Sequence, residues 1–185
     1  MINFKTALKQ VLSREGFYSN AAEDAGGETV WGIARNRHPD WNGWEMVDEW
    51  KLQPDFPNNM RESATLKGMV EKFYWREFWG PLKCEQMPNQ ELAEELFEQA
   101  VNIGLVTAIM NLQRALNVLN DQDQALTMDG VLGPVTLAAV FHCANQGDNA
   151  ELLKTLNCLQ RYRYIEIVEH NPKKKKWFRG WLERA

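Results

Sequence analysis

Residues 91–119 constrain the fold more than any other segment, because they are apolar around much of the helix that they would form. A helix that is apolar on most of its circumference is stable only when other elements bury it. We therefore expect this segment to be the buried central helix of the fold. Gly104 lies within it and costs a helix about 1 kcal/mol relative to alanine, so it marks a break or a tight crossing. The apolar positions are Leu92, Leu96, Phe97, Ala100, Val101, Ile103, Ala108, Leu112 and Leu116.

Further helices are expected on both sides of this segment. Residues 2–14 and 63–79 carry apolar side chains at helical spacing, and Ser63 is placed to cap the second of these helices. Residues 134–146 and 148–169 complete a helical second half. Between the first two helices, residues 34–60 contain three prolines, and we expect short helices that alternate with loops.

Residues 17–33 have a different character from the helical segments. They contain a Gly-Gly pair, the β-branched residues Thr29 and Val30, and the run Trp31-Gly32-Ile33, which together predict a small β-hairpin or an irregular ribbon. Gly32 is expected to permit a close approach of the backbone. The predicted fold class is thus mainly α (α+β), with a small β-hairpin after the first helix and a central buried helix.

Chain length, net charge, apolar runs and cysteine spacing argue against several classes of protein. A chain of 185 residues fits one domain, and a net charge of −4 disfavours a dedicated nucleic-acid binder. No apolar run approaches the roughly 20 residues that cross a bilayer. The first residues resemble an amphipathic helix more than a cleaved export signal, so we expect synthesis and folding in the cytoplasm. The three cysteines, Cys84, Cys143 and Cys158, have no CxxC spacing, which argues against a disulfide framework or a zinc ribbon.

The strongest functional signal is a glutamate at the end of the first helix, followed by a glycine-rich turn. A glycine follows Glu15 and exposes its carboxyl to a cleft, while Phe17 and Tyr18 supply apolar walls that disfavour the ionised form. Asp24 and Thr29 follow in the downstream segment, on either side of a Gly-Gly pair at which the chain is expected to turn back. Cleavage of a glycosidic bond needs one carboxyl that donates a proton and a second group that stabilises the cation or directs water. The pattern therefore predicts a glycosidase.

These residues resemble a known family. Residues 15–18 and 24–33 are similar to the N-terminal signature of glycoside hydrolase family 108, which comprises lysozyme-like N-acetylmuramidases common in phages and prophages of Gram-negative bacteria. Residues 97–104 and 112–116 resemble the central helix of that family. Residues 129–136 resemble the predicted peptidoglycan-binding half that accompanies these enzymes.

The resemblance implies a lysozyme-like fold in which residues 1–90 form the muramidase lobe and residues 91–185 a helical lobe resembling a peptidoglycan-binding half, integrated in one domain. The chain departs from the family pattern at three places. Phe17 replaces a glycine, Ala25 a proline and Glu98 an aspartate, and none of these changes removes a proposed catalytic group.

The resemblance also implies the catalytic roles. Glu15 would be the catalytic acid, and the Glu, Asp and Thr trio of the wider phage-type lysozymes would place Asp24 and Thr29 in supporting roles. Glu23 and Glu28 are close enough in sequence to compete with Asp24 for the role of the second carboxylate.

Aromatic and amide side chains are the candidates for substrate binding. Tyr18, Trp31, Trp41 and Trp44 are expected to stack against sugar rings, since the faces of pyranose rings pack on aromatics; core packing is the alternative for each. Asn102 lies on a mostly buried helix and must find polar partners, either by lining the cleft or by anchoring a loop backbone.

The implied function is that of an endolysin that cleaves the β-1,4 bond between N-acetylmuramic acid and N-acetylglucosamine. It would act as a monomer on peptidoglycan in the periplasm, after release by a holin, and without a metal ion or other cofactor. A non-catalytic peptidoglycan-binding or secretion-accessory protein on the same fold is the alternative. An amidase or peptidase would need a metal or cysteine site that the sparse His and Cys residues do not offer.

Residues 173–181 interleave basic and aromatic side chains near the C-terminus. Such a segment could make weak contact with anionic polymers or lipid headgroups of the cell envelope. The alternative is a solvated basic turn before a short helix whose aromatic side chains pack inward.

Overall fold

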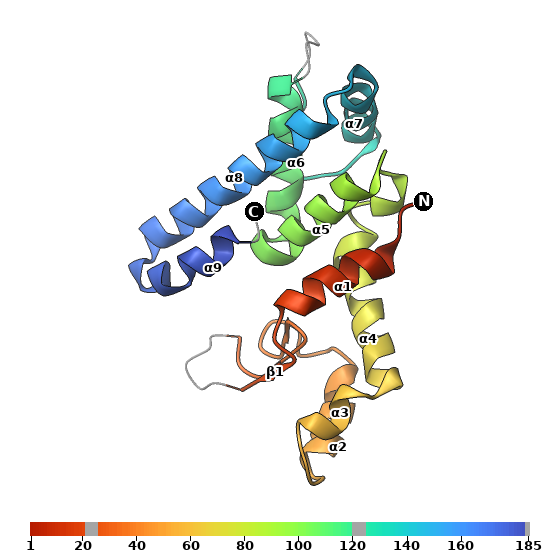
Figure 1. Cartoon of the computed structure of the whole chain (residues 1–185), viewed down its shortest axis with the longest axis vertical. Coiled ribbons are helices and arrows are strands. Elements are labelled where there is room, and N and C mark those ends of the chain that lie inside the picture. The colour runs from red at the N-terminus through yellow and green to blue at the C-terminus, as the bar shows by residue number, and fades with distance from the viewer. Residues whose placement is uncertain (21–25, 120–124, 184–185) are drawn as a thin grey trace. The chain divides into compact units, whose positions relative to one another are not determined.

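The computed structural model describes residues 1–20, 26–119 and 125–183, which form mainly helices together with one small sheet (Figure 1). Contacts within the chain divide it into two compact units. The N-terminal unit is Phe4–Glu77, and the C-terminal unit is Met1–Asn3 together with Phe78–Ala185. The predicted fold class, mainly α with a small β element, is confirmed.

The N-terminal unit contains the first helix, the sheet and three further helices. Its elements are α1 (Phe4–Arg14), β1 (Tyr18–Ser19), β2 (Thr29–Val30), β3 (Ile33–Ala34), α2 (Gly43–Lys51), α3 (Asn58–Arg61) and α4 (Ala64–Tyr74). The apolar face of α1 buries Ala7, Leu8 and Val11. Ser63 caps α4 as predicted, because its side chain accepts a hydrogen bond from the N–H of Leu66 at 3.2 Å.

The sheet is antiparallel and has the strand order β1-β2-β3. Tyr18 pairs with Val30 across the first ladder, and Val30 pairs with Ile33 across the second. The sequence predicted a hairpin within residues 17–33; the structure adds a third short strand, which ends at Ala34. The side chains of Val30 and Ile33 are fully buried and fix the sheet to the core of the unit.

The C-terminal unit is helical. Its elements are η2 (Cys84–Gln86), α5 (Gln90–Ile103), α6 (Leu105–Leu119), α7 (Pro134–Gln146), α8 (Asn149–His170), η3 (Pro172–Trp177) and α9 (Phe178–Leu182). The segment expected to be the central helix is divided at Gly104, whose φ of 92° and ψ of 146° lie outside the helical region. Of the two alternatives for this glycine, the break is correct. The helices α5 and α6 pack on each other and on α8.

Two segments differ from the predicted helices in detail. The helix expected over residues 63–79 ends as an α-helix at Tyr74 and continues as a π-helical turn, η1 (Trp75–Trp79). In the basic C-terminal segment, Trp181 packs on Tyr164 with ring centroids 5.5 Å apart, whereas Trp177 is half exposed beneath the Lys176 ammonium group. Among the described helices, none has the length and apolar character that a membrane-spanning helix requires.

Candidate active site

Glu15 is the first residue after α1. Its backbone N–H donates to the carbonyl of Val11 at 3.2 Å, and its side chain is half-buried. At the next residue, Gly16, no atom lies within 4 Å of the position that a Cβ would occupy, so the backbone is open on that side. The predicted position of Glu15 at the end of the first helix is confirmed.

The turn between β2 and β3 brings the backbone against Glu15. Because Val30 pairs with Ile33, Trp31 and Gly32 form a two-residue turn, and their φ angles are 44° and 80°. Positive φ at both central residues is the property of the type I′ turn, which suits the twist of a hairpin. A Cβ at Gly32 would lie 3.2 Å from Cγ and 3.3 Å from Oε2 of Glu15. Gly32 therefore permits the close approach that the sequence predicted.

Tyr74 of α4 reaches the same turn from another side. Its side chain is 2% exposed, and its hydroxyl donates to the carbonyl of Trp31 at 2.8 Å. Burial raises the pKa of the Tyr74 hydroxyl, and the nearby negative charge of Glu15 raises it further. The Tyr74 hydroxyl therefore stays protonated and holds the turn in place beside Glu15. In the sequence, Tyr74 is part of the apolar pattern of the helix predicted over residues 63–79, and nothing in its spacing signals its approach to Glu15.

The two aromatic residues that follow Glu15 pack on other rings. Phe17 lies edge-on to Trp31 with ring centroids 4.7 Å apart, and Tyr18 lies edge-on to Phe56 at 4.8 Å. Edge-to-face pairs of this kind stabilise the packing beyond the area that they bury. The first pair thus joins the residue before β1 to the β2–β3 turn, and the second joins β1 to the segment between α2 and α3.

Glu28, a candidate for the second carboxylate, is buried among cations. Its side chain is 7% exposed, and it lies 2.7 Å from Nζ of Lys51 and 2.8 Å from Nε of Arg35. The Tyr18 hydroxyl donates to it at 2.9 Å. Arg35 and Lys51 also donate to Asp48, and these hydrogen bonds lower the pKa of Asp48 to about 2. The cluster ties the sheet to α2, so we interpret Glu28 as a structural anion.

Of the other proposed catalytic residues, the structure describes Thr29. Thr29 pairs with Ser19 in the sheet, is half-buried, and donates from its hydroxyl to the carbonyl of Gly27 at 3.2 Å. Asp24 and Glu23 lie outside the described residues. Their roles, and that of Thr29 toward a substrate, stay predictions.

Trp41 and Trp44 are buried, with 7% and 4% of their surface exposed. Their rings lie edge-to-face with centroids 5.0 Å apart, and the indole N–H of Trp44 donates to the carbonyl of His38 at 2.7 Å. The guanidinium of Arg35 covers the Trp44 ring at 4.4 Å. These positions favour a packing role for both tryptophans over stacking against a sugar.

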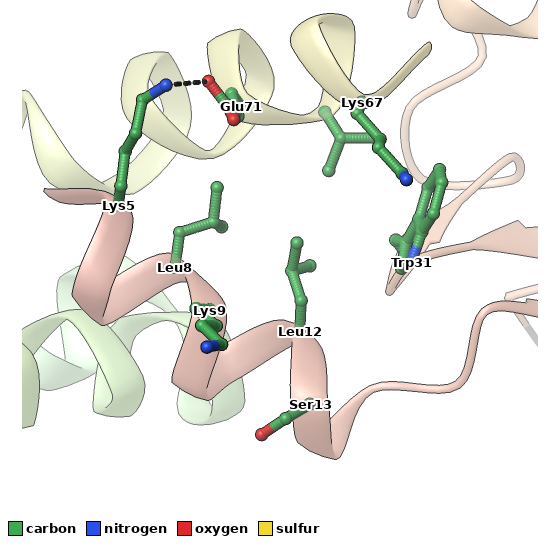
Figure 2. Close-up of a pocket in the computed structure, with 9 residues that line it drawn as sticks. Lys5, Leu8, Lys9, Leu12, Ser13, Trp31, Lys67 and Glu71 are labelled. Carbon is green, nitrogen blue, oxygen red and sulfur yellow. Dashed lines mark ion pairs between the residues drawn. The ribbon is translucent and has the colours of Figure 1, made fainter. Parts of the chain in front are cut away.

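Trp31 is half-buried and forms one wall of a pocket of about 380 Å³ between α1 and α4 (Figure 2). Leu8, Leu12 and Val70 supply the apolar part of the pocket. Lysines from both helices stand around it, and Figure 2 shows Lys67 pointing toward Trp31. Of the four predicted stacking residues, Trp31 and Tyr18 are therefore the two that remain partly accessible.

Asn102 lies in the C-terminal unit, and its amide donates to the carbonyl of Glu98 within the same helix at 2.9 Å. The side chain is half-buried. Within the part of the chain that the structure describes, no group of three or more His, Cys, Asp and Glu side chains could hold a metal ion.

Comparison with known proteins places the chain in a family. Residues 8–104 match the family model of glycosyl hydrolase 108, and residues 107–185 match the model of a predicted peptidoglycan domain. No curated protein matches the chain. The solved structure of SagA from Brucella abortus is similar over 98% of this chain and 88% of that one, with 20% sequence identity and a TM-score of 0.63, so the two share a fold. The chain therefore belongs to glycosyl hydrolase family 108, and it is a glycoside hydrolase that acts on peptidoglycan.

Proposed function

We propose that this hydrolase cleaves the β-1,4 bond between N-acetylmuramic acid and N-acetylglucosamine, with Glu15 as the proton donor. The observation that supports this role best is the place of Glu15 at the end of α1, against the Trp31-Gly32 turn that the buried Tyr74 holds. A general acid must be kept in a fixed position relative to the leaving oxygen. The turn provides that restraint on one side of the carboxyl.

Asp24 is proposed as the second carboxylate, and the Thr29 hydroxyl as a group that helps hold the attacking water. Asp24 would either stabilise the oxocarbenium character or take a proton from water. A separation of about 6.5–9.5 Å between the two carboxyls would leave room for water and give inversion, whereas about 5–5.5 Å would give retention. The ion pairs of Glu28 support Asp24 over Glu28, because a carboxylate that balances two cations is not available for a second task.

Two variants, Glu28→Gln and Asp24→Asn, should show which of the two carboxylates is structural and which is catalytic. We expect Glu28→Gln to lower the free energy of unfolding by about 2 kcal/mol, because it removes the buried anion from two partly buried cations, which then keep the more exposed Asp48 as a partner. The folded fraction should keep its activity. Asp24→Asn should lower activity about a hundredfold or more with little change in stability. Thermal unfolding and turbidity loss of purified sacculi measure the two effects; a Glu28→Gln protein that is stable but inactive would reverse the assignment.

Tyr18 and Trp31 are the proposed sugar-stacking residues, because both rings are partly accessible and lie beside the turn that contacts Glu15. Asn102 is kept as a proposed substrate contact.

We further propose that the enzyme serves as an endolysin, which reaches peptidoglycan in the periplasm through a membrane opening made by a holin. Its partners are then the glycan strands of peptidoglycan and, for export, the holin, and the chain acts as a monomer. The basic segment of residues 173–181 would add at most a weak contact with the envelope, for which the exposed Trp177 and its neighbouring lysines are suited.

Digestion of purified peptidoglycan, followed by mass analysis of the fragments, tests the proposed bond. We expect new reducing ends on N-acetylmuramic acid, with the peptide stems intact. Reducing ends on N-acetylglucosamine would change the bond assignment. Binding to sacculi without any released fragment would favour the non-catalytic accessory protein.

A further inference from the structure

A second pocket, of about 440 Å³, lies in the C-terminal unit between α6 and α8. Met110 and Arg114, four residues apart on α6, form one wall. Tyr162, Arg163 and Glu166, within a five-residue stretch of α8, form the opposite wall. On both helices the residues that line the pocket recur at intervals of three and four, so they lie on one face of each helix. None of these residues belongs to the N-terminal unit that carries Glu15.

The pocket has an apolar part that is open to solvent. Met110 is 39% exposed, Tyr162 is 52% exposed, and Met128, from the segment between α6 and α7, is 49% exposed. Single exposed apolar side chains are ordinary on a protein surface, but several that share one pocket indicate an interaction site. Methionine and tyrosine adapt to the irregular shape of a bound molecule and contribute apolar contact area.

The pocket also contains two guanidinium groups. Arg114 lines the pocket from α6. Arg163 pairs with Glu166 at 3.1 Å, and both side chains of this pair are partly exposed. A guanidinium group binds a carboxylate with two parallel hydrogen bonds, which gives both affinity and orientation. The Glu166 carboxylate, which lines the same pocket as the two guanidinium groups, can bind an ammonium group.

We propose that this pocket binds the acidic peptide stem of peptidoglycan. Arg114 and Arg163 bind carboxylates of the stem, Glu166 faces a free amino group, and the exposed apolar side chains contact the aliphatic parts of the peptide. The match of residues 107–185 to a peptidoglycan domain covers both walls of the pocket. The proposal rests on the proposed action on peptidoglycan and assigns the recognition of the stem to residues separate from the hydrolytic ones.

Isothermal titration calorimetry with a soluble tetrapeptide stem, its carboxylates free, tests the proposal on the full chain. The peptide has no glycosidic bond, so the measurement does not depend on Glu15. We expect binding by the unmodified chain and a loss of affinity of about tenfold or more in the double variant Arg114→Ala with Arg163→Ala. The matched control is Arg161→Ala, which removes an exposed arginine of α8 that does not line the pocket, and it should bind as the unmodified chain does.

A double variant Arg114→Lys with Arg163→Lys keeps the positive charges but removes the planar guanidinium groups. Its affinity for the stem should therefore lie between that of the unmodified chain and that of the alanine double variant. Equal affinity of the Ala double variant and the unmodified chain would overturn the proposal. Equal affinity for a stem whose carboxylates are amidated would also overturn it, as would binding of stem-free glycan in place of the peptide. A chain that binds the stem yet releases no reducing ends would refute the proposed hydrolysis and leave the stem site in place.

Discussion

Glu15→Gln is expected to lower the rate of peptidoglycan lysis by at least about a hundredfold while the protein remains folded. The amide has the shape of the carboxyl but cannot donate the proton that the leaving oxygen needs, and general acid catalysis contributes about 10²–10⁴-fold. The substitution adds no atom at the turn, so the contact with Gly32 is kept. Release of soluble muropeptides from sacculi measures the rate, and circular dichroism with thermal unfolding checks the fold.

Glu62→Gln is the matched control for this experiment. Glu62 lies in the same unit, but its side chain is 84% exposed, and it forms an ion pair with Lys67 at 2.8 Å. Exposed ion pairs contribute little to stability, so this variant should lyse sacculi at the rate of the unmodified chain. Lysis by Glu15→Gln at a rate close to that of Glu62→Gln would remove Glu15 from the mechanism.

The parts of the fold that follow from local rules were predictable from the sequence. The apolar spacing along α1 reflects the face that buries Leu8 and Val11, and the cap at Ser63 depends on a residue only three positions away. The break at Gly104 follows from the conformational freedom of glycine. The position of Glu15 could be predicted for the same reason, since a helix end followed by glycine is a local pattern.

The surroundings of Glu15 depend on contacts between distant parts of the chain, which no spacing rule supplies. Tyr74 follows Trp31 by 43 residues, yet its hydroxyl holds the Trp31 carbonyl. Glu28 resembled any other acidic residue near the motif until the fold placed two cations against it. Trp44 carries no sequence signal that distinguishes a sugar platform from a core ring, and its burial came from the packing around Arg35 and His38. Local patterns therefore predicted the position of Glu15, and tertiary packing determined which residues surround it.

Gly32→Ala should damage both stability and catalysis, because the added methyl group falls at the point where the turn, Glu15 and Tyr74 meet. An alanine at a φ of 80° is strained by about 1–2 kcal/mol, and its Cβ would lie only 2.5 Å from the Tyr74 hydroxyl. We expect a loss of about 2–4 kcal/mol in the free energy of unfolding, and a Tm lower by roughly 5–15 °C. The folded protein should also lose at least about tenfold in lytic rate, because Glu15 must move away from the new methyl group.

A control and a compensating change make this prediction specific. Gly68 lies within α4, and no atom is within 4 Å of its Cβ position, so Gly68→Ala should leave the lytic rate unchanged and stabilise the helix by up to about 1 kcal/mol. Tyr74→Phe removes the hydroxyl with which the new methyl group of Gly32→Ala would clash. The double variant should therefore lose less free energy of unfolding than the sum of the losses in the two single variants. Additive losses of stability would mean that the turn and Tyr74 act independently. An unchanged Tm and lytic rate in Gly32→Ala would show that the close contact at Gly32 does not hold Glu15 in place.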